Sequence, residues 1–285
     1  MKEIVIISGK GGTGKTVLAA SIAALAKNKV MGDCDVDASN LYLLLHPEVT
    51  EKHDFYAGLI PAIDLSKCNQ CGLCQELCRF EAIKISQEQT VIDFVSCEGC
   101  GLCALVCPQQ AIQMNENHCG EWYLSETKYG LLIYARLGIA EENSGKLVAL
   151  VRQNAQEVAK KKNLELIIID GPPGIGCPLI ASISGANLAI VVTEPTLSGI
   201  HDLERVIKVT QHFGVKVVVI INKYDLNLEN SSRIEEFCAQ NSISVGGKIH
   251  FDNVITEALV KGLPVVEYSD NKVTKEIRNI WRKVF

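Results

Sequence analysis

The chain has 285 residues, 33 acidic against 28 basic side chains and a formal net charge of −5. This balance lacks the basic excess of a non-specific nucleic-acid binder, so we expect no nucleic-acid partner. No apolar run approaches the roughly 20 residues that cross a bilayer, and Met1–Ile7 leads straight into a glycine-rich segment instead of a secretory cleavage site. We therefore expect a soluble, cytoplasmic protein without stable membrane insertion, whose cysteines stay reduced.

Short β-branched runs alternate with helical patterns over most of the chain. Each run is bounded by turn residues, and the helical patterns lie between the runs. Such alternation predicts an α/β fold with a mostly parallel sheet and helices on both faces. We expect strands at residues 4–7, 166–169, 188–192 and 217–221, and helices at residues 17–26, 198–213 and 229–240.

A phosphate-binding loop follows the first strand and opens the first helix. Its sequence from Ser8 is Ser-Gly-Lys-Gly-Gly-Thr-Gly-Lys-Thr, in the context that a P-loop requires. Backbone N–H groups of such a loop surround phosphates at a helix N-terminus, while Lys15 reaches the β- and γ-phosphates and Thr16 ligates Mg²⁺. The predicted nucleotide contacts are Gly9, Gly11, Gly12, Thr13, Gly14, Lys15 and Thr16.

Lys10 gives this loop the deviant form Lys-Gly-Gly-x-Gly-Lys-Thr. With it the chain resembles the MinD/ParA family of P-loop ATPases and the nitrogenase iron protein, over nearly all residues outside a central segment. The resemblance implies an ATPase that binds ATP and Mg²⁺ and forms a homodimer, in which Lys10 reaches the partner's nucleotide. Physically, such a lysine supplies positive charge where phosphoryl transfer develops negative charge.

Two acidic segments follow predicted strands. Asp33 and Asp35 belong to Asp-Cys-Asp-Val-Asp, which resembles the family's switch I; the resemblance implies that Asp35 orients the attacking water, and Asp33 is expected to support the Mg²⁺ shell. Asp170 ends the strand at 166–169 and precedes Gly-Pro-Pro-Gly, as in a Walker B segment and switch II. It is expected to hold Mg²⁺ through water, although acidic residues at strand ends also serve as helix caps.

A further motif bears on the base. Asn222-Lys-Tyr-Asp225 follows the strand at 217–221, and Asn-Lys-x-Asp is the guanine-reading pattern of GTPases. In the MinD-type family an asparagine at this place reads adenine. The resemblance therefore favours ATP, with Asn222 and Asp225 as candidate base contacts and GTP as the alternative.

Eight of the twelve cysteines form two matching runs. Each run has the spacing Cys-x2-Cys-x2-Cys-x3-Cys followed by x3-Ala-Ile, which predicts two copies of one small unit. In two-cluster ferredoxins the fourth cysteine of each run ligates the other cluster. We expect one 4Fe-4S cluster on Cys68, Cys71, Cys74 and Cys107, and a second on Cys97, Cys100, Cys103 and Cys78. Structural zinc is the alternative, but it does not explain the third cysteine of each run.

The segment with these runs resembles a bacterial two-cluster ferredoxin, including the Cys107-Pro108 pair. Arg79 stands where the first run would carry proline. The predicted organisation is a P-loop ATPase domain at 1–58 and 116–285, interrupted at 59–115 by a ferredoxin-like α+β domain with two 4Fe-4S clusters.

Four cysteines lie outside the runs, namely Cys34, Cys119, Cys177 and Cys238. Cys238 is expected in the core. Cys177 follows switch II and is either a buried structural thiol or, together with Cys119, a ligand of an extra cluster between subunits. The amphipathic run at 273–285 is expected to pack on the sheet, with a membrane-surface helix as the alternative. Residues 141–146 have the composition of an exposed turn and helix start.

The chain as a whole resembles ferredoxin-containing MinD-type ATPases, relatives of the Mrp iron–sulfur carriers. This implies nucleotide-gated dimer switching coupled to electron transfer with a redox or metal-cofactor-binding partner. The alternative is a scaffold or carrier that assembles iron–sulfur or mixed-metal clusters. A positioning ATPase of ParA type is disfavoured by the acidic balance and the cysteine-rich segment.

Overall fold

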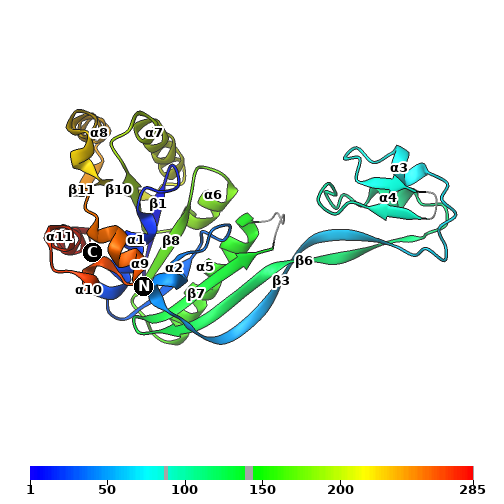
Figure 1. Cartoon of the computed structure of the whole chain (residues 1–285), viewed down its shortest axis with the longest axis horizontal. Helices are drawn as coiled ribbons and strands as arrows, with labels where there is room; N and C mark the ends of the chain where they lie inside the picture. The colour runs from blue at the N-terminus through cyan, green and yellow to red at the C-terminus, as the bar shows by residue number, and fades with distance from the viewer. Residues whose placement is uncertain (87–88, 139–143, 285) are drawn as a thin grey trace. The chain divides into compact units, whose positions relative to one another are not determined.

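The computed structural model describes residues 1–86, 89–138 and 144–284. Two compact units are distinguished (Figure 1). Unit 1 contains residues 1–53, 121–137 and 144–285, and unit 2 contains residues 54–120 and 138–143. The expected insert at 59–115 lies inside unit 2, which extends about five residues further at each side because long strands lead into it and out of it.

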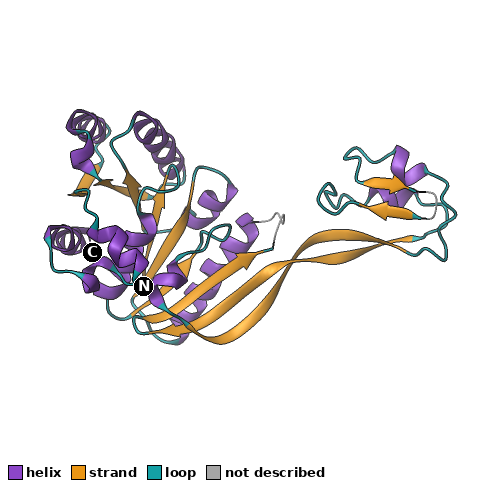
Figure 2. Ribbon diagram, in the orientation of Figure 1, coloured by secondary structure: helices purple, strands orange, loops and turns teal. Residues whose placement is uncertain are grey.

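The described residues of the chain form a sheet of nine strands, in the order β11-β10-β9-β1-β8-β2-β7-β6-β3 (Figure 2). The interior strand β1 pairs in parallel with β8 on one side and β9 on the other. Six of the seven residues of β1 are buried, as expected for a strand covered on both faces. The strands are β1 Lys2–Ser8, β2 Lys29–Asp33, β3 Glu48–Ile63, β6 Ile112–Thr127, β7 Gly130–Leu137, β8 Leu166–Pro173, β9 Leu188–Thr193, β10 Lys216–Asn222 and β11 Ser244–Ile249.

Helices cover both faces of the parallel part of this sheet. Apolar residues of α1, α2, α9, α10 and α11 join Ile4 and Ile6 in one buried cluster. The other group, α5 to α8, contacts β8, β9 and β10. In unit 1 the helices are α1 Lys15–Leu25, α2 Leu41–Leu45, α5 Ser144–Lys161, α6 Cys177–Ile183, α7 Leu197–His212, α8 Leu228–Gln240, α9 Val254–Val260, α10 Val265–Tyr268 and α11 Lys272–Val284.

The last helix, α11, packs into this core. Val273, Ile277 and Ile280 are at most 2% exposed, so its apolar face covers the sheet. Across the described residues, no helix combines the length and the apolar character that crossing a membrane would require. The expected exposed turn at 141–146 is described only in part: α5 begins at Ser144, and residues 141–143 lie outside the described residues.

Two strands of sixteen residues, β3 and β6, begin in one unit and end in the other. In unit 1, β6 is joined to β7 by Lys128 and Tyr129 alone, a connection that requires antiparallel pairing. The expected parallel sheet therefore carries an antiparallel edge. These strands had no expected counterpart in the sequence.

Unit 2 shows its sequence repeat in its backbone. The N–H of Asp64 donates to the carbonyl of Ala111, and the N–H of Asp93 donates to that of Ala82, both at 2.7 Å. Each half thus hydrogen-bonds to the other in the same way. The elements of unit 2 beside the long strands are α3 Leu73–Glu76, β4 Ile83–Ile85, β5 Thr90–Ile92 and α4 Leu102–Val106, with β4 and β5 antiparallel.

Candidate functional site

The glycine-rich loop connects β1 to α1 and turns tightly at Gly14. This residue has φ +93°, and a Cβ there would lie 2.4 Å from the Asn222 amide nitrogen. That amide donates to the carbonyl of Thr13 at 2.8 Å. Glycine is therefore required both by the backbone conformation and by the approach of β10. Gly9 is also constrained, because a Cβ on it would lie 2.4 Å from Asp202 Cβ.

A cavity of about 680 Å³ opens in front of this loop in unit 1, within the range of small-molecule sites. Its walls include the expected residues Gly11, Gly12, Thr13, Gly14, Lys15, Thr16, Asp35 and Asn222. Five other expected residues do not line it: Gly9, Lys10, Asp33, Asp170 and Asp225.

Lys15 and Asp35 face each other inside this cavity. The Lys15 Nζ lies 3.4 Å from Asp35 Oδ2, and the Lys15 side chain is only 6% exposed. Burial raises the pKa of Asp35, while the Lys15 ammonium lowers it. A phosphate group entering the cavity would compete with Asp35 for the Lys15 charge.

Asp33, which was expected to support the Mg²⁺ shell, is fully buried. Its carboxylate accepts three hydrogen bonds. The donors are Ser39 Oγ at 2.7 Å and the backbone N–H groups of Leu41 and Asp35 at 3.1 and 3.2 Å. Burial and the neighbouring Asp170 raise the Asp33 pKa to about 7. Asp33 therefore positions the segment that carries Asp35.

Asp170 lies on β8, beside Asp33 on β2. It is 1% exposed, and neither carboxylate oxygen has a hydrogen-bond partner of normal geometry. Burial raises the Asp170 pKa to about 6, while Lys15 and the nearby Thr16 hydroxyl lower it. The hydroxyl of Thr13 is likewise buried without a partner.

Lys10 is held within its own chain. Its Nζ lies 2.6 Å from Glu194 Oε1 and donates to the hydroxyls of Thr196 and Ser198 at 3.2 and 3.1 Å. Lys223 also pairs with Glu194, at 3.1 Å. Burial opposes ionisation of Glu194, but these two lysines hold its pKa below the usual value.

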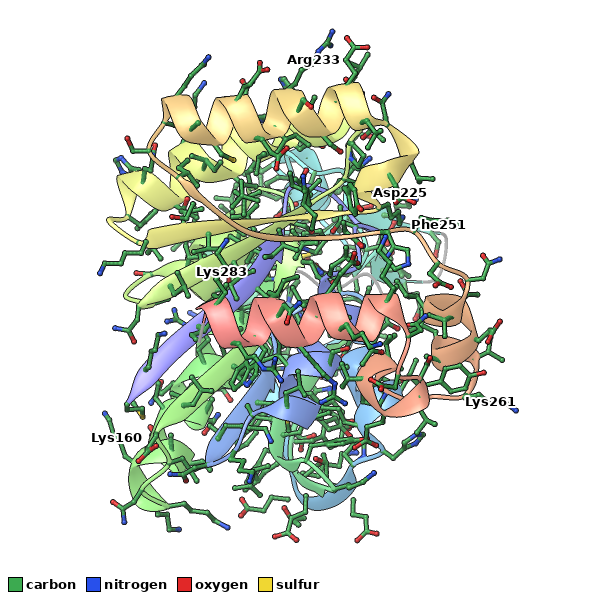
Figure 3. The ribbon with its side chains drawn as sticks, turned by 90° about the vertical axis from the view of Figure 1, so that its left-hand side faces the viewer. Lys160, Asp225, Arg233, Phe251, Lys261 and Lys283 are labelled. Atoms are coloured by element: carbon green, nitrogen blue, oxygen red, sulfur yellow. The ribbon has the colours of Figure 1, made fainter. Side chains whose placement is uncertain are left out.

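Two residues of the Asn-Lys-x-Asp pattern, Asn222 and Lys223, line the cavity, whereas Asp225 does not. Asn222 is 6% exposed and lines the cavity. Asp225 is exposed, and its Oδ1 accepts the N–H of Phe251 at 2.7 Å (Figure 3). Asp225, which was expected to contact the base, does not line the cavity, and its carboxylate caps the loop after β11.

Several cavity residues were missed by the sequence analysis. They come from α2 and from the segment that follows β11, namely Leu43, Leu44, Phe251, Asp252, Ile255, Thr256 and Leu259. None belongs to a recognisable motif. The available signal was the amphipathic pattern of α9, which does not say what its half-buried residues face.

The eight run cysteines fall into two sets in unit 2. One small cavity is lined by Cys68, Cys71, Cys74 and Cys107. Another is lined by Cys78, Cys97, Cys100 and Cys103. These are the two expected sets, each with its last cysteine supplied by the other run.

The spacing of these thiols bears on the metal that they suit. Tetrahedral zinc with Zn–S bonds of about 2.3 Å requires sulfurs about 3.8 Å apart. All eight thiols lie in the described part of the chain, and no three of them come within 4.8 Å of one another.

The remaining cysteines have contrasting surroundings. Cys119 is fully buried in unit 2 and donates to the carbonyl of Ala57 at 3.0 Å. Cys238 is 1% exposed in the core of unit 1, as expected. Cys177 is exposed at the start of α6, so it is not the buried thiol that was preferred.

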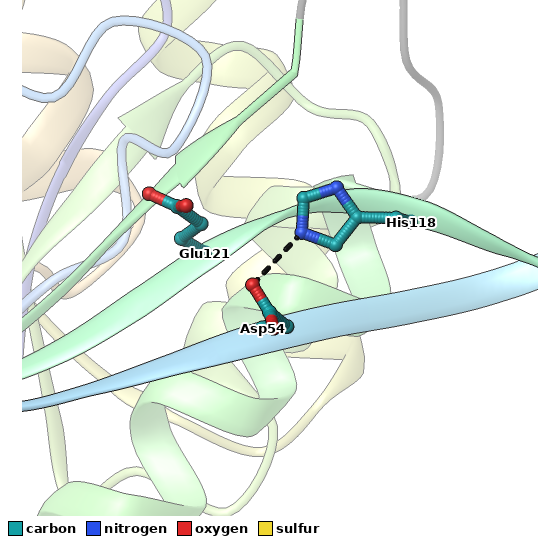
Figure 4. A group of neighbouring side chains, drawn as sticks. All are labelled: Asp54, His118 and Glu121. Carbon is teal, nitrogen blue, oxygen red and sulfur yellow. Dashed lines mark hydrogen bonds and ion pairs between the residues drawn. The ribbon is translucent and has the colours of Figure 1, made fainter.

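A histidine–aspartate contact joins β3 and β6 in unit 2. His118 Nε2 lies 3.1 Å from Asp54 Oδ1, and both side chains are about half exposed (Figure 4). Tyr56 packs edge-on against the His118 ring at 5.3 Å. Glu121, also drawn in Figure 4, pairs with Lys52 at 2.7 Å.

The sequence profile of the CobQ/CobB/MinD/ParA nucleotide binding domain matches residues 4–265. The chain belongs to this family. It is therefore a P-loop ATPase of the MinD/ParA type, with the α/β fold described above.

Relatives in the MinD/ParA family match along nearly the whole chain. An uncharacterized protein of Methanocaldococcus jannaschii is 34% identical over 286 residues, which cover 99% of this chain and 96% of the relative. The septum site-determining protein MinD of Bacillus subtilis is 25% identical over 293 residues, covering 99% and 88%. The structure of MinD from Pyrococcus horikoshii complexed with Mg-ADP superposes with a TM-score of 0.61 at 19% identity, covering 99% and 95% of the two chains. This last likeness supports the fold.

The MinD/ParA assignment explains why the Asp170 carboxylate and the Thr13 hydroxyl are buried without hydrogen-bond partners. An ionised carboxylate buried without a partner is strongly unfavourable, and so is a buried hydroxyl without one. Asp170 and Thr13 show this condition beside Lys15 and Thr16. The donor set of Asp170, the Thr16 hydroxyl and the loop amides fits Mg²⁺ and phosphate oxygens.

Proposed function

We propose that this protein is an ATP-hydrolysing iron–sulfur protein, in which nucleotide-gated switching of a homodimer is coupled to electron transfer with a redox or metal-cofactor-binding partner. The observation that carries the proposal is the sorting of eight cysteines into two cavities with four thiols each. A MinD/ParA-type ATPase needs no such thiols for nucleotide hydrolysis. Their presence adds a redox function to the ATPase.

Each nucleotide-site residue has a role that follows from its position. Lys15 neutralises the β- and γ-phosphates, and Thr16 and Asp170 hold Mg²⁺, directly or through water. Mg²⁺, when bound, neutralises charge on the phosphate oxygens. Asp35, released from Lys15 by the incoming phosphate, accepts a hydrogen bond from the attacking water. Asn222 orients the base from the floor of the cavity.

Dimer formation would use Lys10. In the single chain its charge is satisfied by Glu194, so reaching a second protomer's nucleotide requires breaking that pair. The pair is 29% and 15% exposed, and such ion pairs contribute only about 0.2–1 kcal/mol. The charge of a bound triphosphate is a stronger attraction, which makes nucleotide the trigger for dimerisation.

Coupling to the cysteine unit would begin at α2. Leu43 and Leu44 line the nucleotide cavity. Tyr42, which precedes them on α2, stacks on Tyr134 of β7, with ring centres 5.7 Å apart. Tyr134 stacks in turn on Tyr123 of β6, at 4.8 Å. β6 continues along the chain into unit 2. A shift of α2 with nucleotide state would therefore move rings that pack on β6.

The test uses protein purified without oxygen. We expect eight irons and eight acid-labile sulfides per chain, and MgATP-dependent electron transfer from the dithionite-reduced protein to methyl viologen. Lys15→Ala should retain the iron and lose the ATP dependence. Equal transfer rates with and without MgATP, or in wild type and Lys15→Ala, would refute the coupling.

Cysteine variants provide the matched control for the iron. Cys103→Ala should lose iron, because it removes one wall of a four-thiol cavity, whereas Cys238→Ala in the hydrophobic core should retain all eight irons. Full iron content in Cys103→Ala would contradict the proposed ligand set.

The exposure of Cys177 at the start of α6 favours a second candidate function, a cluster scaffold or carrier. In a symmetric dimer one cysteine from each protomer would supply two ligands to a transferable cluster. Such a carrier would release iron to an apo-ferredoxin acceptor, and Cys177→Ala would abolish the release. Complete retention of iron during that incubation argues for the electron-transfer function.

A further inference from the structure

The two cysteine cavities are related by the repeat but do not have the same walls. Cys68 and Cys97 lie 29 positions apart, and the same offset relates the other members of the runs. By the same offset, Thr90 in the wall of the Cys68 cavity is equivalent to Pro61 in the wall of the other cavity. Gln109 is likewise equivalent to Phe80. At these two positions the cavity of Cys68 has polar side chains where the other cavity has apolar ones.

Thr90 is the most important difference between the two cavities, because its hydroxyl is a hydrogen-bond donor next to Cys68. It begins β5, is 5% exposed, and its Oγ1 lies 3.6 Å from Cys68 Sγ. A thiolate bound to iron has no proton, so the threonine hydroxyl must be the donor in the loaded protein. Pro61, at the equivalent place, has neither a side-chain donor nor an N–H group.

Hydrogen bonds to cluster sulfurs are one of the factors that set reduction potential. A donor aimed at sulfur stabilises the extra negative charge of the reduced state more than the oxidised state. We infer that Thr90 makes the cluster held by Cys68, Cys71, Cys74 and Cys107 the easier of the two to reduce. This inference rests on the proposed iron–sulfur function. It states which of the two clusters receives the first added electron.

Charged residues near the cavities also affect the difference between the two reduction potentials, some increasing it and others decreasing it. Glu98 lines the cavity of Cys97, whereas the repeat places the neutral Asn69 at the Cys68 cavity. A carboxylate disfavours reduction, so this difference widens the gap. Arg79 follows Cys78 and opposes it, but Arg79 is exposed and does not line the cavity, and water screens its charge. Glu98 is exposed as well, so its charge is screened in the same way. The buried Thr90 hydroxyl therefore decides the order of the two potentials.

The electron balance is simple. One electron from an external reductant such as dithionite reduces one cluster by one charge, and the second cluster stays oxidised until a second electron arrives. With unequal sites, the first electron resides at the Thr90 site. Transfer from the other site oxidises that cluster and reduces this one, with no further reactant.

The experiment is a redox titration of the full chain, followed by electron paramagnetic resonance. We expect two midpoint potentials in the wild type. Thr90→Val, which keeps the shape and removes the donor, should lower the higher midpoint by about a tenfold change in the reduction equilibrium, equivalent to 59 mV for one electron, and leave the lower midpoint in place. Thr90→Ser keeps the hydroxyl and should keep both midpoints.

A second variant tests the assignment of the two potentials. Glu98→Gln removes the wall carboxylate and should raise the lower midpoint. A shift of the lower midpoint by Thr90→Val, a rise of the higher one by Glu98→Gln, or unchanged potentials in Thr90→Val would overturn the inference. Fewer than eight irons in the wild type would instead refute the proposed function, so the two failures are distinguishable.

Discussion

Glu194 holds the Lys10 ammonium 2.6 Å from its Oε1, at the end of β9 and outside the nucleotide cavity. Lys10, which we propose to act on a partner protomer, thus forms an ion pair within its own chain. This ion pair competes with dimerisation, and its strength sets how much nucleotide charge is needed to release Lys10.

Glu194→Gln should favour the nucleotide-dependent dimer, because it weakens the competing partner of Lys10. A partly exposed ion pair of about 0.2–1 kcal/mol corresponds to about a two- to fivefold tighter dimer. Sedimentation velocity with a slowly hydrolysed ATP analogue measures this. The matched control is Glu229→Gln, which breaks the exposed pair with Arg233 on α8 and should leave the dimer unchanged; weaker dimerisation of Glu194→Gln would contradict the competition.

Asp170→Asn should stabilise the nucleotide-free protein at pH 8. Burial raises the Asp170 pKa to about 6, above the unfolded value of about 3.9, so the folded state binds the proton more tightly. The contribution of Asp170 to the free energy of unfolding is therefore largest below about pH 4, and it falls as the pH rises through 6. The variant escapes that loss, and we expect a melting temperature several degrees higher at pH 8 and little difference at pH 4.5.

Thermal unfolding at several pH values, without Mg²⁺ or nucleotide, measures this difference. Asp33→Asn is the comparison, because Asp33 is equally buried but accepts hydrogen bonds from Ser39 and Leu41. Asparagine keeps one acceptor oxygen but turns an NH2 group toward donors that need the other. Asp33→Asn should therefore gain less stability at pH 8 than Asp170→Asn does, although the Asp33 pKa is also raised, to about 7. A gain for Asp170→Asn that stays constant from pH 4.5 to 8 would show that ionisation is not its cause.

Asp225→Ala should leave the preference between adenine and guanine nucleotides unchanged. The Asp225 carboxylate accepts the Phe251 N–H and does not line the cavity. Titration calorimetry with Mg-ADP and Mg-GDP should show both affinities falling together as the loop loosens. A selective loss of Mg-GDP binding would restore the guanine-reading role, whereas Asn222→Ala should weaken both nucleotides strongly by disturbing Thr13.

Phe251→Ala should weaken nucleotide binding about tenfold. Phe251 lines the cavity but is 47% exposed, the position of a ring that stacks on a base, and such stacking contributes about 1–3 kcal/mol. Phe251→Tyr keeps the ring and should bind as the wild type does. Equal affinities of the alanine variant and the wild type would place the base elsewhere in the cavity.

The sequence predicted the parts whose chemistry is local. The P-loop around Lys15 is one continuous segment, so its position on a strand and a helix N-terminus follows from eight neighbouring residues. The cysteine sets were also predictable, because the fixed spacing of Cys68 and its partners leaves few ways to close a site. The buried position of Asp170 was also predictable, because it follows an apolar run that forms the interior strand β8.

Other residues were unpredictable because their roles depend on contacts between distant segments. Phe251 reaches the cavity only because the chain crosses it after β11. Asp225 carries a motif shared with GTPases, and only the nearby Phe251 N–H shows what its carboxylate does. Asp33 could not be separated from Asp35 by sequence, since its hydrogen bonds depend on how the following residues fold back. The strands β3 and β6 gave no regular signal because much of each is exposed.

The interruption of the sheet by unit 2 has a consequence for synthesis on the ribosome. All eight thiols have emerged by residue 107, while β1 still lacks both neighbours, because β8 begins at Leu166 and β9 at Leu188. Domains generally fold as units while the chain grows. Unit 2 can therefore form its two four-thiol cavities before the nucleotide site exists, so this unit would fold independently of ATP.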